Sequence, residues 1–232
     1  MRILAALCIV TQAWEVNANV EKTVFLGPAA VVVSHVHPSL NDLRLHTLNH
    51  SHTILPTQLP VRFPSKPAPH GLDSWYLLQH LEPGRRYEVR ICWPATQPTD
   101  FWLDTFTIQQ TFDTPELITS LAHYSQQLQE SGCQLGDYSQ DIQPAAAQSL
   151  LFLRVQAAAT YYSANRTLME HPEPVDVDII LDPFLLNILP RSLGPVAVYI
   201  TAVAIGAWIL SGYFYHWLTS TVTGPPHKPH VD

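Results

Sequence analysis

The sequence predicts a mostly β fold, an immunoglobulin- or fibronectin-III-like sandwich in the lumen with one packed helix, followed by a single C-terminal transmembrane helix. Three observations predict this fold class. An apolar run follows the N-terminus, an uncharged apolar run occupies residues 193–218, and short apolar segments separated by turn residues fill the region between them.

The N-terminal run has the pattern of a secretory signal peptide. Arg2 is followed by the apolar residues 3–10 and then by small residues, and cleavage is expected after Ala18. The alternative is a buried strand or helix at the start of a cytosolic fold. The second apolar run favours the signal peptide, because both runs point to the same membrane topology.

The C-terminal run contains no Asp, Glu, Lys or Arg. About 20 apolar residues in a helix cover the hydrocarbon core of a bilayer, and the aromatic residues Tyr213, Tyr215 and Trp217 suit its boundary. A buried helix and a GPI-anchor signal are the alternatives. The polar end of the chain argues against the anchor signal, since such signals usually end in apolar residues.

These two runs predict four segments and a type I topology. A signal peptide (1–18) precedes a lumenal β-rich domain (19–192), a transmembrane helix (193–218) and a cytosolic tail (219–232). The 232 residues carry 12 Lys and Arg against 19 Asp and Glu, a formal net charge of −7. An acidic chain without a basic run argues against a nucleic-acid partner, because such binding needs cations against the phosphates.

The lumenal region contains two cysteines and two glycosylation sequons. Cys8 leaves with the signal peptide, and Cys92 and Cys133 are expected to pair in an oxidising compartment, with two free thiols as the alternative. The sequons at Asn49 and Asn165 lie among polar residues and are candidate glycosylation sites on surface loops.

The first part of the domain predicts short strands. Residues 23–26 and 30–33 are apolar and β-branched, and residues 43–47 alternate between apolar and polar. Residues 56–69 hold five prolines, which lack an amide donor. We expect this stretch to be an extended surface connection.

Two strands joined by a turn are the clearest feature of the sequence. Residues 74–81 and 87–93 read as strands around a turn at Pro83 and Gly84, with Tyr87, Val89 and Ile91 on one face. The spacing of Pro83, Gly84 and Tyr87 resembles the tyrosine corner of fibronectin type III domains. A further strand is expected over residues 101–108.

An amphipathic helix follows, starting near Asp113 and ending at Gly132. Its apolar residues recur at helical spacing, which favours packing on the sandwich over a partner site; they are Leu117, Leu121, Tyr124 and Leu128. Strands are then expected over 150–161 and 175–180, with a polar loop at 163–174 between them. We expect Asp182 and Pro183 to end the last strand.

Two apolar features are candidate contacts with the membrane or a partner. The first is a short piece before the span, expected at the membrane interface or docked on a neighbour; it comprises Phe184, Leu185, Ile188 and Leu189. The second is the pair Ala202 and Gly206 within the span, whose small side chains let helices approach closely.

The catalytic possibilities are few. Asp176 and Asp178 could hold a divalent metal against a sugar nucleotide, but that chemistry needs a nucleotide-binding α/β fold, and we interpret them as the polar face of a strand. The histidines are densest in two sets without a ligand cluster, His35 with His37 and His46 with His50 and His52. No hydrolase, zinc-protease or nucleotide-binding motif occurs, and the sequence predicts no catalytic residue, metal or cofactor.

Three stretches together resemble a known family. They are VEKTVFLGP after the signal peptide, SWYLLQHLEPGRRYEVRICWPATQPTDFWLDTF in the domain, and VDIILDPFLLNILPRSL entering the span. They resemble the fungal co-activator of GPI mannosyltransferase II. The resemblance implies a glycosylated endoplasmic reticulum (ER) membrane accessory subunit that binds the polytopic mannosyltransferase adding the second mannose to GPI precursors, without catalytic residues of its own.

Two alternatives remain open from the residues alone. One is a cell-surface adhesion or receptor ectodomain, and the other is a lumenal enzyme using Asp176 and Asp178. Lys228 lies too far from the C-terminus for a dilysine retrieval signal and no KDEL-like end is present, so ER residence would come from the partner or from the short span.

Overall fold

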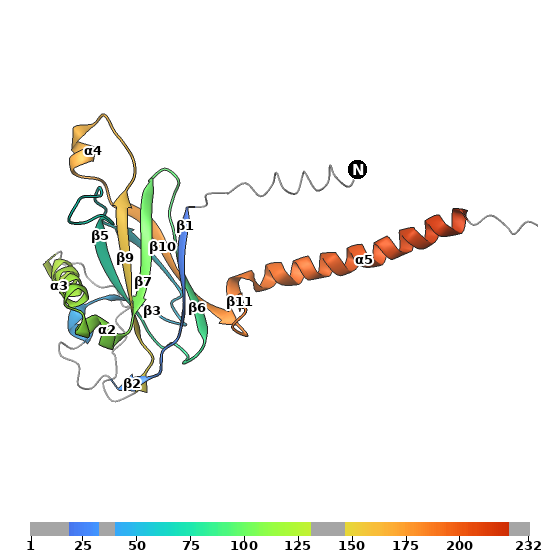
Figure 1. Ribbon diagram of the computed structural model, residues 1–232, viewed down its shortest axis with the longest axis horizontal. Coiled ribbons are helices and arrows are strands. Elements are labelled where there is room, and N and C mark those ends of the chain that lie inside the picture. The colour runs from blue at the N-terminus through green and yellow to red at the C-terminus, as the bar shows by residue number, and fades with distance from the viewer. Residues whose placement is uncertain (1–18, 33–39, 131–146, 223–232) are drawn as a thin grey trace, which may run out of the picture. The chain divides into compact units, whose positions relative to one another are not determined.

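A computed structural model describes residues 19–32, 40–130 and 147–222 (Figure 1). The signal-peptide prediction and the distal part of the predicted cytosolic tail lie outside these residues. The chain divides into two compact units, one that ends at Phe184 and one that begins at Leu185.

The first unit contains two sheets. In one sheet, β1 pairs with β6, β6 with β10 and β10 with β4, all antiparallel, and β10 also pairs with the short β11 (Leu189–Pro190). Its strands are β1 (Val20–Leu26), β4 (Ile54–Leu59), β6 (Arg86–Cys92) and β10 (Val175–Leu185). Because β6 and β10 are flanked on both sides, they are the central strands.

The other sheet has the order β3-β5-β9-β7. Its strands are β3 (His46–Leu48), β5 (Leu72–Leu78), β7 (Thr99–Phe106) and β9 (Leu151–Ala159). The short β3 is parallel to β5, and the remaining pairs are antiparallel. A small separate ribbon pairs β2 (Val31–Val32) with β8 (Ala147–Gln148).

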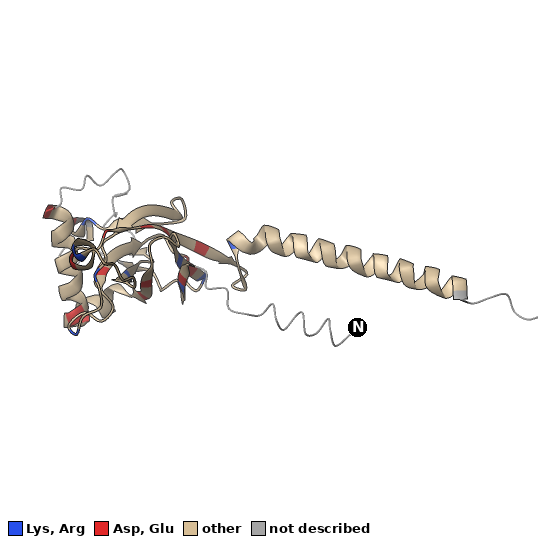
Figure 2. Cartoon of the chain, turned by 90° about the horizontal axis from the view of Figure 1, so that it is seen from above, with Lys and Arg blue, Asp and Glu red and all other residues tan. Residues whose placement is uncertain are grey.

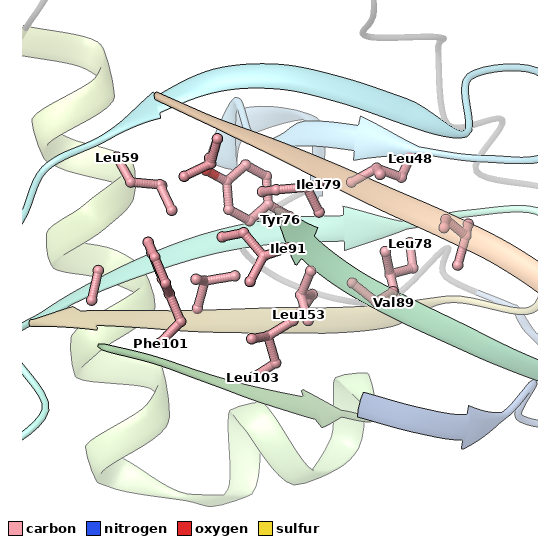
Figure 3. Packing of buried hydrophobic residues seen from close by; sticks show 14 of the residues in the cluster. Leu48, Leu59, Tyr76, Leu78, Val89, Ile91, Phe101, Leu103, Leu153 and Ile179 are labelled. Atoms are coloured by element: carbon pink, nitrogen blue, oxygen red, sulfur yellow. The ribbon is translucent and has the colours of Figure 1, made fainter. Parts of the chain in front are cut away.

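The main core lies between the two sheets, where alternate residues of each strand meet (Figure 3). Tyr87, Val89 and Ile91 of β6 are buried there, as their period-two spacing predicts. Leu153 on β9 and Ile179 on β10 are fully buried in the same cluster. The predicted mostly β class, with two packed sheets, is therefore confirmed.

Helices α2 (Ile108–Asp113) and α3 (Pro115–Glu130) cover the other face of the second sheet (Figure 1). This second core joins helix side chains to the outer residues of β5 and β9 and includes Leu117, Leu121, Tyr124, Trp75, Leu77 and Phe152. The indole of Trp75 donates a hydrogen bond to the Ser120 hydroxyl at 3.0 Å. The prediction that this helix packs on the sandwich is confirmed.

Helix α2 was not predicted, and the strand expected over 101–108 is correspondingly too long. Strand β7 ends at Phe106 because Thr107 caps α2. The Thr107 side chain accepts from the Gln110 amide, and the Gln110 side chain accepts from the Thr107 amide, which is a capping box. The strand expected over 43–47 is likewise shorter, since a 3₁₀ turn (Leu40–Leu43) precedes β3.

Two predictions based on proline are wrong. The 56–69 stretch is not only a connection, because Pro56 lies within β4, which pairs with β10. β4 is an edge strand, where a missing amide needs no partner. Pro183 does not end β10 either. It pairs with Tyr87 of β6 on one side, while the β4 pairing on the other side already ends at Ile180.

The loop expected at 163–174 contains a short helix, α4 (Arg166–Glu170). Asn165 caps it, since its side-chain oxygen accepts from the Thr167 amide at 3.0 Å. Asparagine side chains accept hydrogen bonds from nearby backbone amides both in loops and at the start of helices. The sequence of this segment is therefore compatible with a loop and with a short helix.

The second unit contains β11 (Leu189–Pro190), a 3₁₀ turn (Arg191–Leu193) and the long helix α5 (Gly194–Val222). Residues Arg191–Thr221 are long and apolar enough to cross a membrane. No charged side chain occurs along α5 (Figure 2). The helix continues beyond the predicted end at residue 218, since residues 219–222 remain helical.

The turn between β5 and β6 is fixed by contacts to its backbone. The Tyr87 hydroxyl accepts a hydrogen bond from the Glu82 amide at 2.9 Å. Gly84 has a φ of 75° and its amide donates to the Gly27 carbonyl at 2.9 Å. A side chain at Gly27 would overlap the Glu82 carbonyl. The tyrosine and the two glycines therefore bind this turn to the end of β1.

We expect Tyr87→Phe to destabilise the sandwich, because the Glu82 amide would lose its acceptor. The loss should be about 1 kcal/mol, which corresponds to a fall of roughly 2–4 °C in the midpoint of thermal unfolding. The measurement is thermal unfolding of the detergent-solubilised full chain. Tyr162→Phe is the matched control, because Tyr162 is exposed. Equal midpoints for the two variants would contradict the role of the Tyr87 hydroxyl.

Candidate functional site

The Asp176 and Asp178 carboxylates lie on the outward face of β10, which alternates with the buried residues Val175, Val177 and Ile179. Asp176 accepts a hydrogen bond from the Gln58 side chain at 2.8 Å, and its amide donates to the Gln97 side chain at 3.0 Å. These bonds tie β10 to β4 and to the loop before β7. Asp176 thus contributes to strand pairing.

A cleft of about 490 Å³ lies beside this carboxylate pair, and its lining includes Gln58, Cys92, Trp93, Asp176 and Asp178. Within the described residues, no group of three or more His, Cys, Asp or Glu side chains is placed to hold a metal ion. Two exposed carboxylates on one strand offer hydrogen-bond acceptors here.

A buried charged cluster, which sequence reasoning missed, lies on the same face of the sheet. Glu88 is 4% exposed, and its carboxylate is 3.3 Å from Lys22 and 3.6 Å from Arg90. Arg90 is also 3.7 Å from Asp182, which is buried as well. These ion pairs join β1, β6 and β10. The alternation of residues along β6 places Glu88 and Arg90 on one face, but only the strand order brings Asp182 beside them.

A second cleft, of about 800 Å³, lies between α3 and the segment before β5. Asp73 accepts hydrogen bonds from the Ser120 hydroxyl at 2.5 Å and from the side-chain amide of Gln156 at 2.8 Å. His70 lies 3.1 Å from Gln156 and stacks on Trp102, with ring centroids 4.3 Å apart. This network fastens α3 to the sheet. Its residues come from separate segments, so no local motif marks it.

The histidine sets do not assemble a site in the described part of the chain. His35 and His37 lie outside the described residues. His46 on β3 is partly buried, and burial lowers its pKa, which favours the neutral ring. His50 and His52 are exposed in the following loop.

Cys92 lies half-buried at the end of β6, and its predicted partner Cys133 lies outside the described residues. Burial raises the pKa of the Cys92 thiol; Arg90 opposes this shift and Asp178 adds to it. The Cys92–Cys133 disulfide stays a prediction.

The two sequon asparagines lie in different surroundings. Asn49 is 3% exposed, and its side-chain oxygen accepts from the amides of Ser51 and His52, both at 2.8 Å. Asn165 is exposed at the start of α4. A glycan needs a side-chain nitrogen that faces solvent, so the geometry favours Asn165 as the acceptor.

The predicted contact residues before the span differ in exposure. Phe184 ends the first unit and is buried, with Arg86 over its ring at 5.8 Å. In the second unit, Leu185 and Ile188 are exposed and Leu189 is partly buried. Sequence reasoning overlooked Leu186 between them, which is 91% exposed.

Ala202 and Gly206 are exposed on α5, one turn apart. A side chain added at Gly206 would meet nothing within 4 Å in this chain. The shallow surface at these two residues is therefore open to another helix.

Comparison with known proteins gives one consistent family. The family model for the GPI-mannosyltransferase II co-activator matches residues 67–213, which run from the segment before β5 to within α5. A GPI mannosyltransferase 2 subunit of Schizosaccharomyces pombe is 22% identical over 129 residues, 56% of this chain and 48% of that protein. The matched region thus spans about half the length of this relative. No solved structure matches the chain.

The family match covers more than half of the 232 residues, and it includes both the core strands β5, β6, β7, β9 and β10 and most of the apolar helix. The chain therefore belongs to the fungal GPI-mannosyltransferase II co-activator family.

Proposed function

We propose that this chain is a non-catalytic accessory subunit that binds and supports the mannosyltransferase adding the second mannose to GPI precursors. The observation that carries the proposal is the extent of the family match, which runs from the sandwich through α5 to Tyr213. The matched region thus joins strands of the sandwich to an apolar helix in one chain. Such a chain can hold a module beside a membrane enzyme.

The polar groups of the sandwich support a non-catalytic role. Asp176 is bonded to Gln58, Glu88 to Lys22, and Asp73 to Ser120. Each of these carboxylates joins separate segments of the fold.

The topology proposed for this function is a single-pass type I protein of the ER membrane with a lumenal sandwich. The uncharged α5 is long enough to span the bilayer. Within lipid, helices associate through close packing rather than through the hydrophobic effect. We therefore place the contact with a helix of the polytopic enzyme at the Ala202 and Gly206 face.

Gly206→Leu should weaken the complex, because a large side chain separates the helix backbones. We expect about tenfold lower recovery of the mannosyltransferase, equivalent to ~1.4 kcal/mol. The measurement is affinity purification of the tagged full chain from ER membranes in mild detergent, with quantification of the co-purified enzyme.

Gly212→Leu is the matched control for this experiment. A side chain at Gly212 also meets nothing within 4 Å, and the six-residue separation places it on a different face of the helix from Gly206. Equal loss in both variants would contradict the assigned face. Recovery of no mannosyltransferase by the unsubstituted chain would contradict the proposed function itself.

The double variant Asp176→Asn/Asp178→Asn tests the enzymatic alternative. An accessory subunit should keep its ability to support GPI synthesis in cells that lack the native chain, because asparagine preserves shape and hydrogen bonding while removing both charges. The readout is the amount of GPI precursor carrying a second mannose. Loss of that product with normal chain abundance would indicate that the carboxylates take part in chemistry.

Glycosylation should depend on Asn165. Asn165→Gln is expected to remove the mobility shift produced by endoglycosidase H, whose action also marks an ER form rather than a mature cell-surface form. Asn49→Gln should leave that shift unchanged and lower the unfolding midpoint, because the bonds to Ser51 and His52 are lost. A shift that disappears only with Asn49→Gln would reverse this assignment.

A further inference from the structure

The turn between β10 and β11 exposes two large apolar side chains. Leu186 is 91% exposed and Ile188 is 78% exposed. The Ile188 amide donates to the Leu185 carbonyl at 3.0 Å, which closes a two-residue turn at Leu186 and Asn187. Residues 186–188 are called the hairpin tip below.

The backbone of the hairpin tip is unfavourable for leucine. Leu186 has a φ of 51° and Asn187 a φ of 58°. Turns with two positive φ values favour Asn-Gly, since glycine has no Cβ and asparagine tolerates this region. Leucine at such a position is strained, and Leu186 gains no burial inside the described chain. Leu186 thus combines a strained backbone with an exposed apolar side chain. An apolar environment outside this chain accounts for this combination.

The hairpin tip adjoins the start of the apolar helix within the same unit. Gly194, the first residue of α5, follows Leu186 by only eight positions. A Cβ at Gly194 would lie 3.5 Å from the Leu185 side chain, so the strand end packs beside the first turn of the helix. Residues 183–190 contain no charged side chain. The hairpin tip therefore lies where an anchored helix enters the lipid.

We propose that the hairpin tip inserts Leu186 and Ile188 into the lumenal leaflet of the bilayer, as a second membrane contact beside α5. The proposal rests on the proposed membrane anchoring of this chain. Lipid removes both side chains from water and offsets the strain at Leu186.

The test uses the full chain in vesicles of dioleoylphosphatidylcholine without the mannosyltransferase. Single cysteines at Leu186, Ile205 or Tyr162 carry an environment-sensitive NBD fluorophore, in a chain whose native cysteines are replaced by serine. Ile205 reports the middle of α5, and Tyr162 is an exposed residue of the sandwich. We expect the label at 186 to emit at shorter wavelength than that at 162, with an iodide quenching constant about threefold or more smaller.

Three outcomes distinguish the possibilities. Equal iodide quenching at 186 and 162, with protection at 205, overturns the insertion and leaves the anchor intact. Iodide access at 205 overturns the anchor as well. Protection at 186 that arises only after addition of purified mannosyltransferase assigns the hairpin tip to the enzyme and overturns lipid insertion.

A second pair of variants keeps the native cysteines. It tests the insertion of Leu186 into lipid even where the chain with serine in place of its cysteines does not fold. The added fluorescence of Leu186→Trp should be quenched by dibrominated phosphatidylcholine about twofold more than that of Tyr162→Trp. Equal quenching of the two added signals overturns the proposal.

Discussion

The pairing of β10 with β6 and β4 is the interaction on which the rest of the structure depends. Alternate residues of β10, such as Val177 and Ile179, fill the core between the sheets, while Asp176 and Asp182 bond outward to neighbouring strands. The same strand continues into the unit that carries α5.

The polar residues of the sandwich are used mainly to hold segments together. Ion pairs join β1, β6 and β10 on one side of the molecule, and the Asp73 network fastens α3 on the other. This distribution agrees with membership of a co-activator family. The surfaces that we propose to meet other molecules are instead apolar: the shallow face of α5 and the hairpin tip.

Patterns set by local periodicity could be predicted from the sequence, and features set by the tertiary arrangement could not. The alternation of Tyr87, Val89 and Ile91 and the spacing of Leu117 and Leu121 each identify one buried face. The effect of a proline depends instead on which neighbour its strand has. Pro56 lies in an edge strand, and Pro183 lies in a stretch of β10 that still pairs with β6, so neither proline ends its strand. The same holds for the candidate functional residues. The small residues of α5 could be identified from the local sequence, whereas the burial of Asn49 and the backbone conformation of Leu186 depend on the folded turns.

Reconstitution measures the central claim most directly. Purified mannosyltransferase is placed in vesicles with increasing amounts of this chain, and mannose transfer to a GPI precursor with one mannose is followed. For an accessory subunit, we expect transfer to increase until the two chains are present in a fixed ratio, and this chain alone to transfer nothing. Transfer by this chain alone, or an enzyme whose abundance and rate do not respond to it, would contradict the accessory role.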